Sequence, residues 1–185
     1  MKFKILLSSL MAFALSGCLN MQSISYATTP SKSDTLNALN LPDTIVYNGE
    51  KFSKTYTTDN LVEYYLKGEK DFSWSKLISV MYDPNLKDID VYIDSIKNVH
   101  DIENHEYSIT KLDENRAIDK TLYYPMPNNA NFSDYEVNFN IATKQNCGII
   151  ILFYAQRFND LKSAREFINS HESYFMTNAP KVECR

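Results

Sequence analysis

The clearest pattern in the chain is an alternation of apolar and polar positions in its middle part. Residues 44–58, TIVYNGEKFSKTYTT, predict two short strands joined at Asn48-Gly49, a dipeptide that favours the tight turn of a β-hairpin. Two further strand-like runs lie around Lys67-Gly68-Glu69. Apolar residues share one face in these runs because they lie two apart: Val62, Tyr64 and Leu66 in the first, and Trp74, Ile78, Val80 and Tyr82 in the second. The four runs predict an antiparallel meander.

The second half of the chain carries more strand patterns. Strands are predicted at about 106–111 and 117–124. The segment DYEVNFNIAT, residues 134–143, alternates strictly, with Tyr135, Val137, Phe139 and Ile141 on its apolar face. The segment GIIILFYAQRF, residues 148–158, is apolar on both faces at its start, which is typical of a central strand.

Two segments have the spacing of amphipathic helices. The first is expected to open at Asp83-Pro84, because Asp is a good cap and Pro fits the first helical position. Its apolar stripe is Leu86, Ile89, Ile93, Ile96 and His100. The second, about residues 160–176, has the stripe Leu161, Ala164, Ile168, His171 and Phe175. The sum predicts an α+β fold, a mainly antiparallel sheet with two amphipathic helices packed on it.

The N-terminus has the pattern of a secretory signal. Lys2 and Lys4 precede an uncharged, mainly apolar run from Ile5 to Leu15. That run is well below the ~20 residues that a membrane-spanning helix needs. Leu15-Ser16-Gly17-Cys18 then resembles the lipobox of bacterial lipoproteins. The resemblance implies that the Cys18 sulfur receives a diacylglycerol, that the chain is cut before it, and that Cys18 becomes the acylated first residue.

This reading divides the chain into a signal peptide (1–17), a lipidated tether (18–43) and one α+β domain (44–185). Two or three acyl chains, at about 0.8 kcal/mol per buried methylene, would make a durable membrane anchor. The tether is rich in Ser, Thr and Asn. Leu19 and Asn20 form no acidic retention signal, which favours the outer membrane, facing the periplasm, in a Gram-negative cell. Two alternatives remain: cleavage after Ser25-Tyr26-Ala27, or residues 1–18 as a buried element.

The net charge and the number of cysteines limit the partners and the covalent bonds that the sequence predicts. The formal net charge is −4, and it becomes about −6 without the signal peptide, with no basic cluster. Nucleic acid is therefore not an expected partner, and lipid headgroups are not expected to hold the protein electrostatically. Of three cysteines, Cys147 and Cys184 remain after Cys18 is lipidated. An even remainder in an exported protein predicts one disulfide, and two free thiols are the alternative.

No catalytic signature is present in the sequence. The four glycines are too few and too dispersed for a phosphate-binding loop, and no G-x-S-x-G motif occurs. The segment HDIENH places His100, Glu103 and His105 close together, but no additional ligand suggests itself. We therefore expect no metal, no cofactor and no catalytic residue. His171, on the apolar stripe of the last helix, is expected to be a hydrogen-bonded residue at the edge of the core.

Three classes of function stay open. We expect a non-enzymatic lipoprotein that binds a protein partner or supports an envelope assembly. A binder of a small molecule or glycan is the alternative, for which an aromatic-lined pocket of roughly 300 Å³ would be the sign, and an enzyme is a third. NDLKSAREFIN, with Arg165, is superficially similar to the peptidoglycan-binding helix of OmpA-like domains but lacks their upstream motif. YYLKGEKDFSWSKLISV resembles small exported bacterial proteins, without implying a function.

Overall fold

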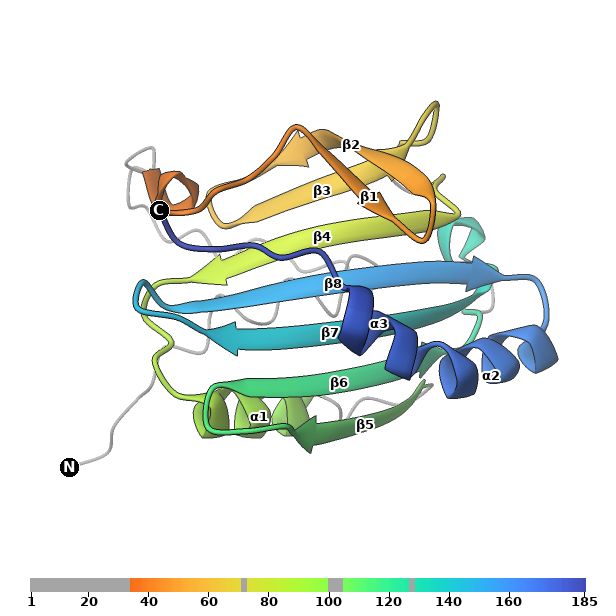
Figure 1. Ribbon diagram of the computed structural model, residues 1–185. Helices are drawn as coiled ribbons and strands as arrows, with labels where there is room; N and C mark the ends of the chain where they lie inside the picture. The colour runs from red at the N-terminus through yellow and green to blue at the C-terminus, as the bar shows by residue number, and fades with distance from the viewer. Residues whose placement is uncertain (1–33, 71–72, 100–104, 127–128) are drawn as a thin grey trace.

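Eight strands form one antiparallel sheet in the computed structural model, which describes residues 34–185 apart from 71–72, 100–104 and 127–128. The order across the sheet is β1-β2-β3-β4-β8-β7-β6-β5 (Figure 1). The strands are β1 (Thr44–Tyr47), β2 (Glu50–Thr57), β3 (Leu61–Leu66), β4 (Lys76–Asp83), β5 (His105–Lys111), β6 (Arg116–Tyr123), β7 (Tyr135–Lys144) and β8 (Ile149–Phe158). The helices are α1 (Ile89–Val99), α2 (Leu161–Ser170) and α3 (Glu172–Asn178), with the 3₁₀ turns η2 (Asp34–Ala38) and η3 (Ala130–Phe132).

The predicted meander is present as β1 to β4, and its first turn is the Asn48-Gly49 hairpin. Both turn residues have positive φ, 50° for Asn48 and 78° for Gly49. This is the geometry of a two-residue type I′ turn, whose twist matches that of the flanking strands. A second meander, β5-β6-β7-β8, joins the first where β8 pairs with β4 from Ile149↔Asp83 to Gln156↔Lys76.

The helices cover both faces of the sheet, which confirms the α+β fold and explains why β8 is apolar on both sides. α2 and α3 lie on one face and α1 on the other (Figure 1). On the α2–α3 face, alternate residues such as Phe139, Tyr154 and Ile78 join Ala164 and Phe175 in the main core. On the other face, α1 packs Ile89, Tyr92 and Ile93 against residues of β7 and β8.

The first helix begins later than predicted, at Ile89 instead of Asp83-Pro84. Asp83 is the last residue of β4, where it pairs with Ile149. Its carboxylate accepts hydrogen bonds from the backbone N–H groups of Asn85 and Leu86, at 2.8 and 3.2 Å, so it stabilises a turn instead of a helix start. Asp88 has the capping role, because its Oδ1 accepts the Asp90 N–H at 2.7 Å.

The last predicted helix is two consecutive helices, α2 and α3, which meet at His171. Asp160 caps α2, accepting the Ser163 N–H at 2.9 Å. Ala164 and Phe175, from the predicted stripe, are fully buried.

Residues 34–43, which the sequence reading assigned to the tether, belong to the fold. Leu39 is fully buried and forms an isolated antiparallel bridge with Cys184. The carbonyl of Pro42 accepts a hydrogen bond from the Tyr64 hydroxyl at 3.0 Å. The sequence pattern of this segment does not indicate these contacts, because each one joins a single residue of the segment to a distant part of the chain. Among the described helices, none combines the length and apolar character that crossing a membrane requires.

Candidate functional site

The chain leaves α3 as an extended segment, residues 179–185, which we call the C-terminal strap. Ala179 has φ −54° and ψ 136°, an extended conformation that contact with the following Pro180 favours. Proline also lacks the N–H that a continuing helix needs. The strap therefore runs back along the sheet and ends beside η2 (Figure 1).

Three attachments fasten the strap to the fold. The predicted disulfide is present: Cys184 is bonded to Cys147 in the turn between β7 and β8, with the Cα atoms 6.2 Å apart. On one edge of the strap, backbone hydrogen bonds join Asn40 N–H to the Glu183 carbonyl and Arg185 N–H to the Ala38 carbonyl, at 2.9 and 2.8 Å.

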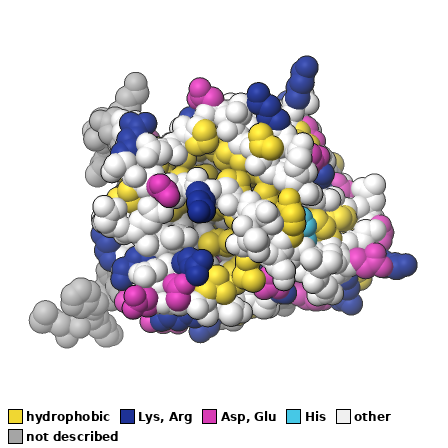
Figure 2. All heavy atoms as spheres, in the orientation of Figure 1, with side chains coloured by type: hydrophobic (Ala, Val, Ile, Leu, Met, Phe, Trp, Pro, Cys, Tyr) yellow, Lys and Arg dark blue, Asp and Glu magenta, His cyan; other side chains and the backbone are white. Residues whose placement is uncertain are grey.

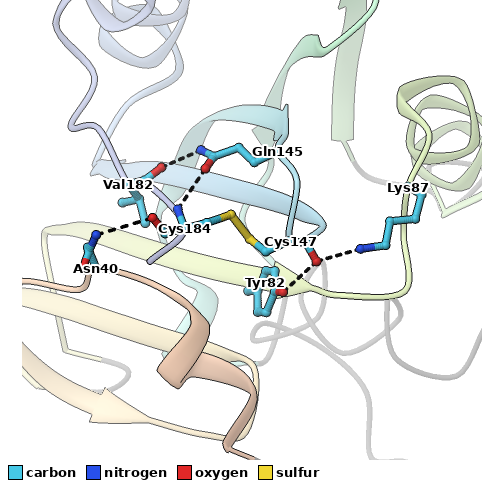
Figure 3. Close-up of a disulfide and its surroundings, with 7 residues drawn as sticks. All are labelled: Asn40, Tyr82, Lys87, Gln145, Cys147, Val182 and Cys184. Carbon is cyan, nitrogen blue, oxygen red and sulfur yellow. Dashed lines mark hydrogen bonds between the residues drawn. A yellow bond between two sulfur atoms is a disulfide. The ribbon is translucent and has the colours of Figure 1, made fainter.

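Gln145 makes the third attachment, on the opposite edge of the strap (Figure 3). Its Nε2 donates to the Val182 carbonyl at 2.9 Å, and its Oε1 accepts the Cys184 N–H at 2.9 Å. In an extended chain these two backbone groups point the same way. One carboxamide thus satisfies both groups, as a neighbouring strand would.

The strap forms one wall of a groove on the α2–α3 face, with a volume of about 330 Å³. Its floor is the sheet, where the cross-strand neighbours Ile141 and Leu152 lie next to the pair Thr143 and Ile150. Met176 and Thr177 of α3 close one end. The helices lie over the other end of these strands (Figure 1), and at this corner the floor residues Ile150 and Leu152 are 3% and 6% exposed. Figure 2 shows hydrophobic side chains exposed in this face, with basic and acidic side chains beside them.

Charged groups stand at the rim of the groove. Arg116, at the start of β6, contacts Asp113 Oδ2 through Nε at 2.8 Å. Across the groove, Lys181 and Glu183 are exposed on the strap, with Val182 buried between them. The Lys181 ammonium forms no ion pair with any residue in the described part of the chain. The groove can therefore hold an apolar group and place a cation beside it.

His171 lies at the edge of the core, as predicted. Its Nε2 is 2.7 Å from the Tyr47 hydroxyl, and its ring stacks on Phe167 with centroids 4.4 Å apart. Burial, and secondly the nearby Lys76 charge, lower the pKa of His171 below 6.5. The neutral imidazole is thus favoured, and it shares a hydrogen bond with the hydroxyl of a tyrosine that is 2% exposed. Since Tyr47 is buried, we interpret the pair as a link between β1 and the α2–α3 corner.

A buried acid lies on the opposite face of the sheet, beneath α1. Asp119 is 1% exposed and accepts hydrogen bonds from the Tyr92 hydroxyl at 2.6 Å and from Asn140 Nδ2 at 2.5 Å. Burial raises the pKa of Asp119 to about 6, against the two hydrogen bonds, which lower it. The carboxyl group can therefore change protonation near neutral pH, inside the sheet.

The other predicted site residues are dispersed. Arg165 is half exposed and donates to Glu106 at 2.7 Å and to Tyr124 at 3.1 Å, which ties α2 to β5. His105 begins β5 and packs its ring near Tyr123. Cys18, His100 and Glu103 lie outside the described residues, and the described residues contain no cluster of potential metal ligands.

The sequence predicts the disulfide, but it does not predict the groove, the hydrogen bonds of Gln145 to the strap or the burial of Asp119. The groove is built from β6, β7, β8 and the strap, which are far apart in the chain. Pro180 was the available signal, because it predicts that an extended segment follows the last helix. For Asp119 the strand pattern gave no clear signal, because the alternate positions on its face, Ala117, Thr121 and Tyr123, are mixed in polarity.

Several solved structures are similar to this chain. The crystal structure of the Saccharomyces cerevisiae Ran-binding protein Mog1p at 1.9 Å has a TM-score of 0.49 with this chain, at 8% identity, covering 80% of this chain and 90% of that one. A mutant of the protein Mog1 has a TM-score of 0.48 at 7% identity, covering 76% of this chain and 94% of that one. No curated protein sequence matches significantly.

A family model matches residues 39–182 of the chain. The match begins at the buried Leu39 and ends at Val182 in the strap, so it includes every strand of the sheet, the helices α1 to α3 and all of the groove lining except Glu183. Because the match covers most of the chain, this protein belongs to that family.

Proposed function

We propose that this protein is a lipid-anchored lipoprotein of the bacterial cell envelope that faces the periplasm and binds a protein partner through the groove, without catalysing a reaction. The lipid anchor rests on the lipobox at Cys18. The binding role rests on one observation, a groove of about 330 Å³ with an aliphatic floor and a wall that is fixed by the disulfide and by Gln145. Concave sites lined by apolar side chains with a few polar groups are typical of binding sites.

A preformed groove favours binding because little conformational entropy is lost on association. The wall beside Lys181 and Glu183 is attached on both edges of the strap. A partner can therefore insert an apolar side chain without first ordering this segment.

A small-molecule ligand is the second candidate, since a volume of about 330 Å³ is at the lower end of the range of ligand pockets. The lining is aliphatic and not aromatic among the described residues. Sugars usually stack on aromatic rings, so this lining favours an aliphatic ligand over a glycan.

Site-specific photo-crosslinking in the native host tests the proposal. A photoreactive residue at the exposed Thr177, in the groove, should give one discrete protein adduct, and the same residue at the exposed Val91 of α1 should not. Met176→Glu, which puts a charge into the groove, should abolish the adduct at Thr177. The captured protein, once purified, should bind the native chain and not this variant. Equal adducts at both positions, or adducts that persist with Met176→Glu, would argue against binding through the groove.

A further inference from the structure

We infer that Asp119, Tyr92 and Asn140 form a proton-controlled lock beneath α1: when Asp119 takes up a proton, the Asn140 carboxamide turns over and accepts a hydrogen bond from it, and α1 is held more firmly on the sheet. This inference is independent of the groove, because α1 lies on the other face of the sheet (Figure 1). Three observations carry it: the contacts of Asp119, three buried oxygen atoms without donors, and the absence of a compensating cation in the described part of the chain.

Asp119 joins α1 to the sheet through its two carboxyl oxygens. The Tyr92 hydroxyl of α1 donates to Oδ1 at 2.6 Å, and Asn140 Nδ2 of β7 donates to Oδ2 at 2.5 Å. Tyr92 is fully buried, and Asp119 is 1% exposed. Both neighbours act as donors here, which suits a carboxylate. A protonated carboxyl group needs an acceptor for its own O–H, so one neighbour must then change its role.

Three oxygen atoms close to Asp119 lack a donor. Asn140 Oδ1, Thr121 Oγ1 and Asn138 Oδ1 are buried and have no hydrogen-bond partner among the residues that the structure describes. Asn140 lies opposite Asp119 in the pairing of β6 with β7, and Thr121 and Asn138 form the next pair on the same face. Buried acceptors without donors are costly. The arrangement around the carboxylate therefore leaves this part of the sheet incompletely hydrogen-bonded.

A half-turn of the Asn140 carboxamide removes this conflict once Asp119 Oδ2 has taken a proton from water. The oxygen and the NH₂ group of a carboxamide are nearly the same in shape, so their exchange needs no repacking. The amide oxygen then accepts the Asp119 O–H, and 2.5 Å lies within the range of O–H···O bonds but below that of N–H···O bonds. The NH₂ group takes the place of Oδ1, and the neighbouring Thr121 and Asn138 carry the oxygens that lack donors.

No cation compensates the carboxylate, since Asp119 forms no ion pair within the described ranges of the chain. Burial raises its pKa to about 6. The ionisable neighbours on α1 and β6 are Tyr92 and Tyr123, which stay neutral because burial raises their pKa values above 10. On β5 the residue opposite Asp119 is Ile109, and His105 lies farther along, beside Tyr123.

Glu136 of β7 is a second acid on this face, opposite Tyr123. Burial raises the pKa of Glu136, and the Arg157 guanidinium of β8, 3.7 Å away, lowers it. Glu136 thus has a cation beside it, in contrast to Asp119. Its titration must still be separated from that of Asp119 in any experiment.

The carboxylate form places an uncompensated charge beneath α1. Opening of the helix gives this charge access to water, whereas the protonated form needs no such access. The pKa of Asp119 is about 6 in the closed state and 3.8 in the reference state. The population with α1 open should therefore rise on the order of 100-fold between pH 4 and 7, with most of the change below pH 6.

Hydrogen exchange of the full chain in lipid nanodiscs, corrected for the intrinsic exchange rate at each pH, measures this opening. Protection of the amides of α1 should fall on the order of 100-fold from pH 4 to 7. Asp119→Asn cannot ionise and should show no such fall. Asp94→Asn, at an exposed position of α1, is the matched control and should keep it, as should Glu136→Gln.

The inference would be overturned by constant protection in the wild type, by a fall of equal size in Asp119→Asn, or by loss of the fall in Glu136→Gln. It would also be wrong if the amides of α1 and of the central strand β8 had equal protection at every pH, because α1 would then open only when the whole domain unfolds.

Turning of Asn140 is measured by NMR on the same chain labelled with ¹³C in Asp and ¹⁵N in Asn. The side-chain amide signals of Asn140 should change at the midpoint of the Asp119 carboxyl signal, whereas those of the exposed Asn146 should not. At pH 4 the Asn140 NH₂ protons should show nuclear Overhauser contacts to Thr121 or Asn138 that are absent at pH 7. The same contacts at both pH values would reject the turning of the carboxamide.

Discussion

Cys147 and Cys184, with Cα atoms 6.2 Å apart, fix the end of the chain to the turn between β7 and β8. This turn leads into β8, which pairs with β4 at the middle of the sheet. The wall of the groove is thereby attached to the most central strands. A C-terminus would otherwise be among the least ordered parts of a domain.

Loss of this disulfide should lower the free energy of unfolding by about 3 to 4 kcal/mol, because the bond closes a loop of 37 residues in the unfolded chain. The double variant Cys147→Ser, Cys184→Ser, measured by urea denaturation, gives this value. Wild-type protein in reducing agent should show the same loss, and a non-reducing peptide map should contain the linked pair. Unchanged stability in both samples would mean that the bond constrains neither state of the chain.

Gln145→Ala should loosen the strap and cost about 2 kcal/mol, since two hydrogen bonds of about 1 kcal/mol each are lost. Hydrogen exchange is the more specific measurement, because the Cys184 amide should lose its protection. The control is Asn146→Ala, at the exposed neighbouring position. Retained protection of Cys184 in Gln145→Ala would show that the disulfide and the backbone bonds to Ala38 and Asn40 hold the strap without Gln145.

Asp119 should make the protein more stable as the pH falls from neutral to about 4. Its pKa is about 6 in the fold and 3.8 in the reference state, so its contribution is fully present below pH 3.8 and is lost as the pH rises through 6. The difference corresponds to about 3 kcal/mol. Urea denaturation across this range should show that Asp119→Asn removes the trend, whereas the exposed Asp94→Asn does not. If the stability of wild type and of Asp119→Asn changed in parallel with pH, the prediction for Asp119 would be wrong.

His171 should have the opposite effect on stability: it should lower the free energy of unfolding as the pH falls below 6.5. Its pKa lies below 6.5 in the fold, so its contribution to stability is complete above pH 6.5 and is lost as the pH falls and the unfolded chain takes up a proton. His171→Gln keeps an acceptor for the Tyr47 hydroxyl but does not titrate. The stability of wild type relative to this variant should decrease on acidification below pH 6.5, and a constant difference would refute the assignment.

The membrane anchor depends on Cys18. Cys18→Ser should abolish acylation and move the protein from the membrane to the soluble fraction, because serine offers no thiol to the lipid. Metabolic labelling with a palmitate analogue, followed by fractionation, measures both effects. Label that persists in Cys18→Ser would exclude this anchor.

The sequence by itself determined the local elements of the fold. The period-two alternation of β3, β4 and β7 fixes which residues of each strand share a face, although Trp74 was wrongly included, since it precedes β4 and packs with Leu77 on the other face. Asn48-Gly49 fixes the register of the first hairpin through its positive φ angles. The pairing of Cys147 with Cys184 followed from counting, since lipidation of Cys18 would leave one possible pair. These inferences succeed because each depends on residues near one another in the chain or on a small set of alternatives.

Only the tertiary structure determined where α1 begins, the raised pKa of Asp119 and the presence of the groove. Asp83 has the local features of a helix cap, but pairing with Ile149 of β8 keeps it in a strand. Burial beneath α1 raises the pKa of Asp119, and the neighbouring residues in the sequence do not indicate that this carboxyl group is shielded from water. The groove exists because the strap returns to the turn between β7 and β8 and forms a wall beside the sheet. Contacts between residues distant in the chain create all three features, and a linear pattern of apolar and polar residues does not specify them.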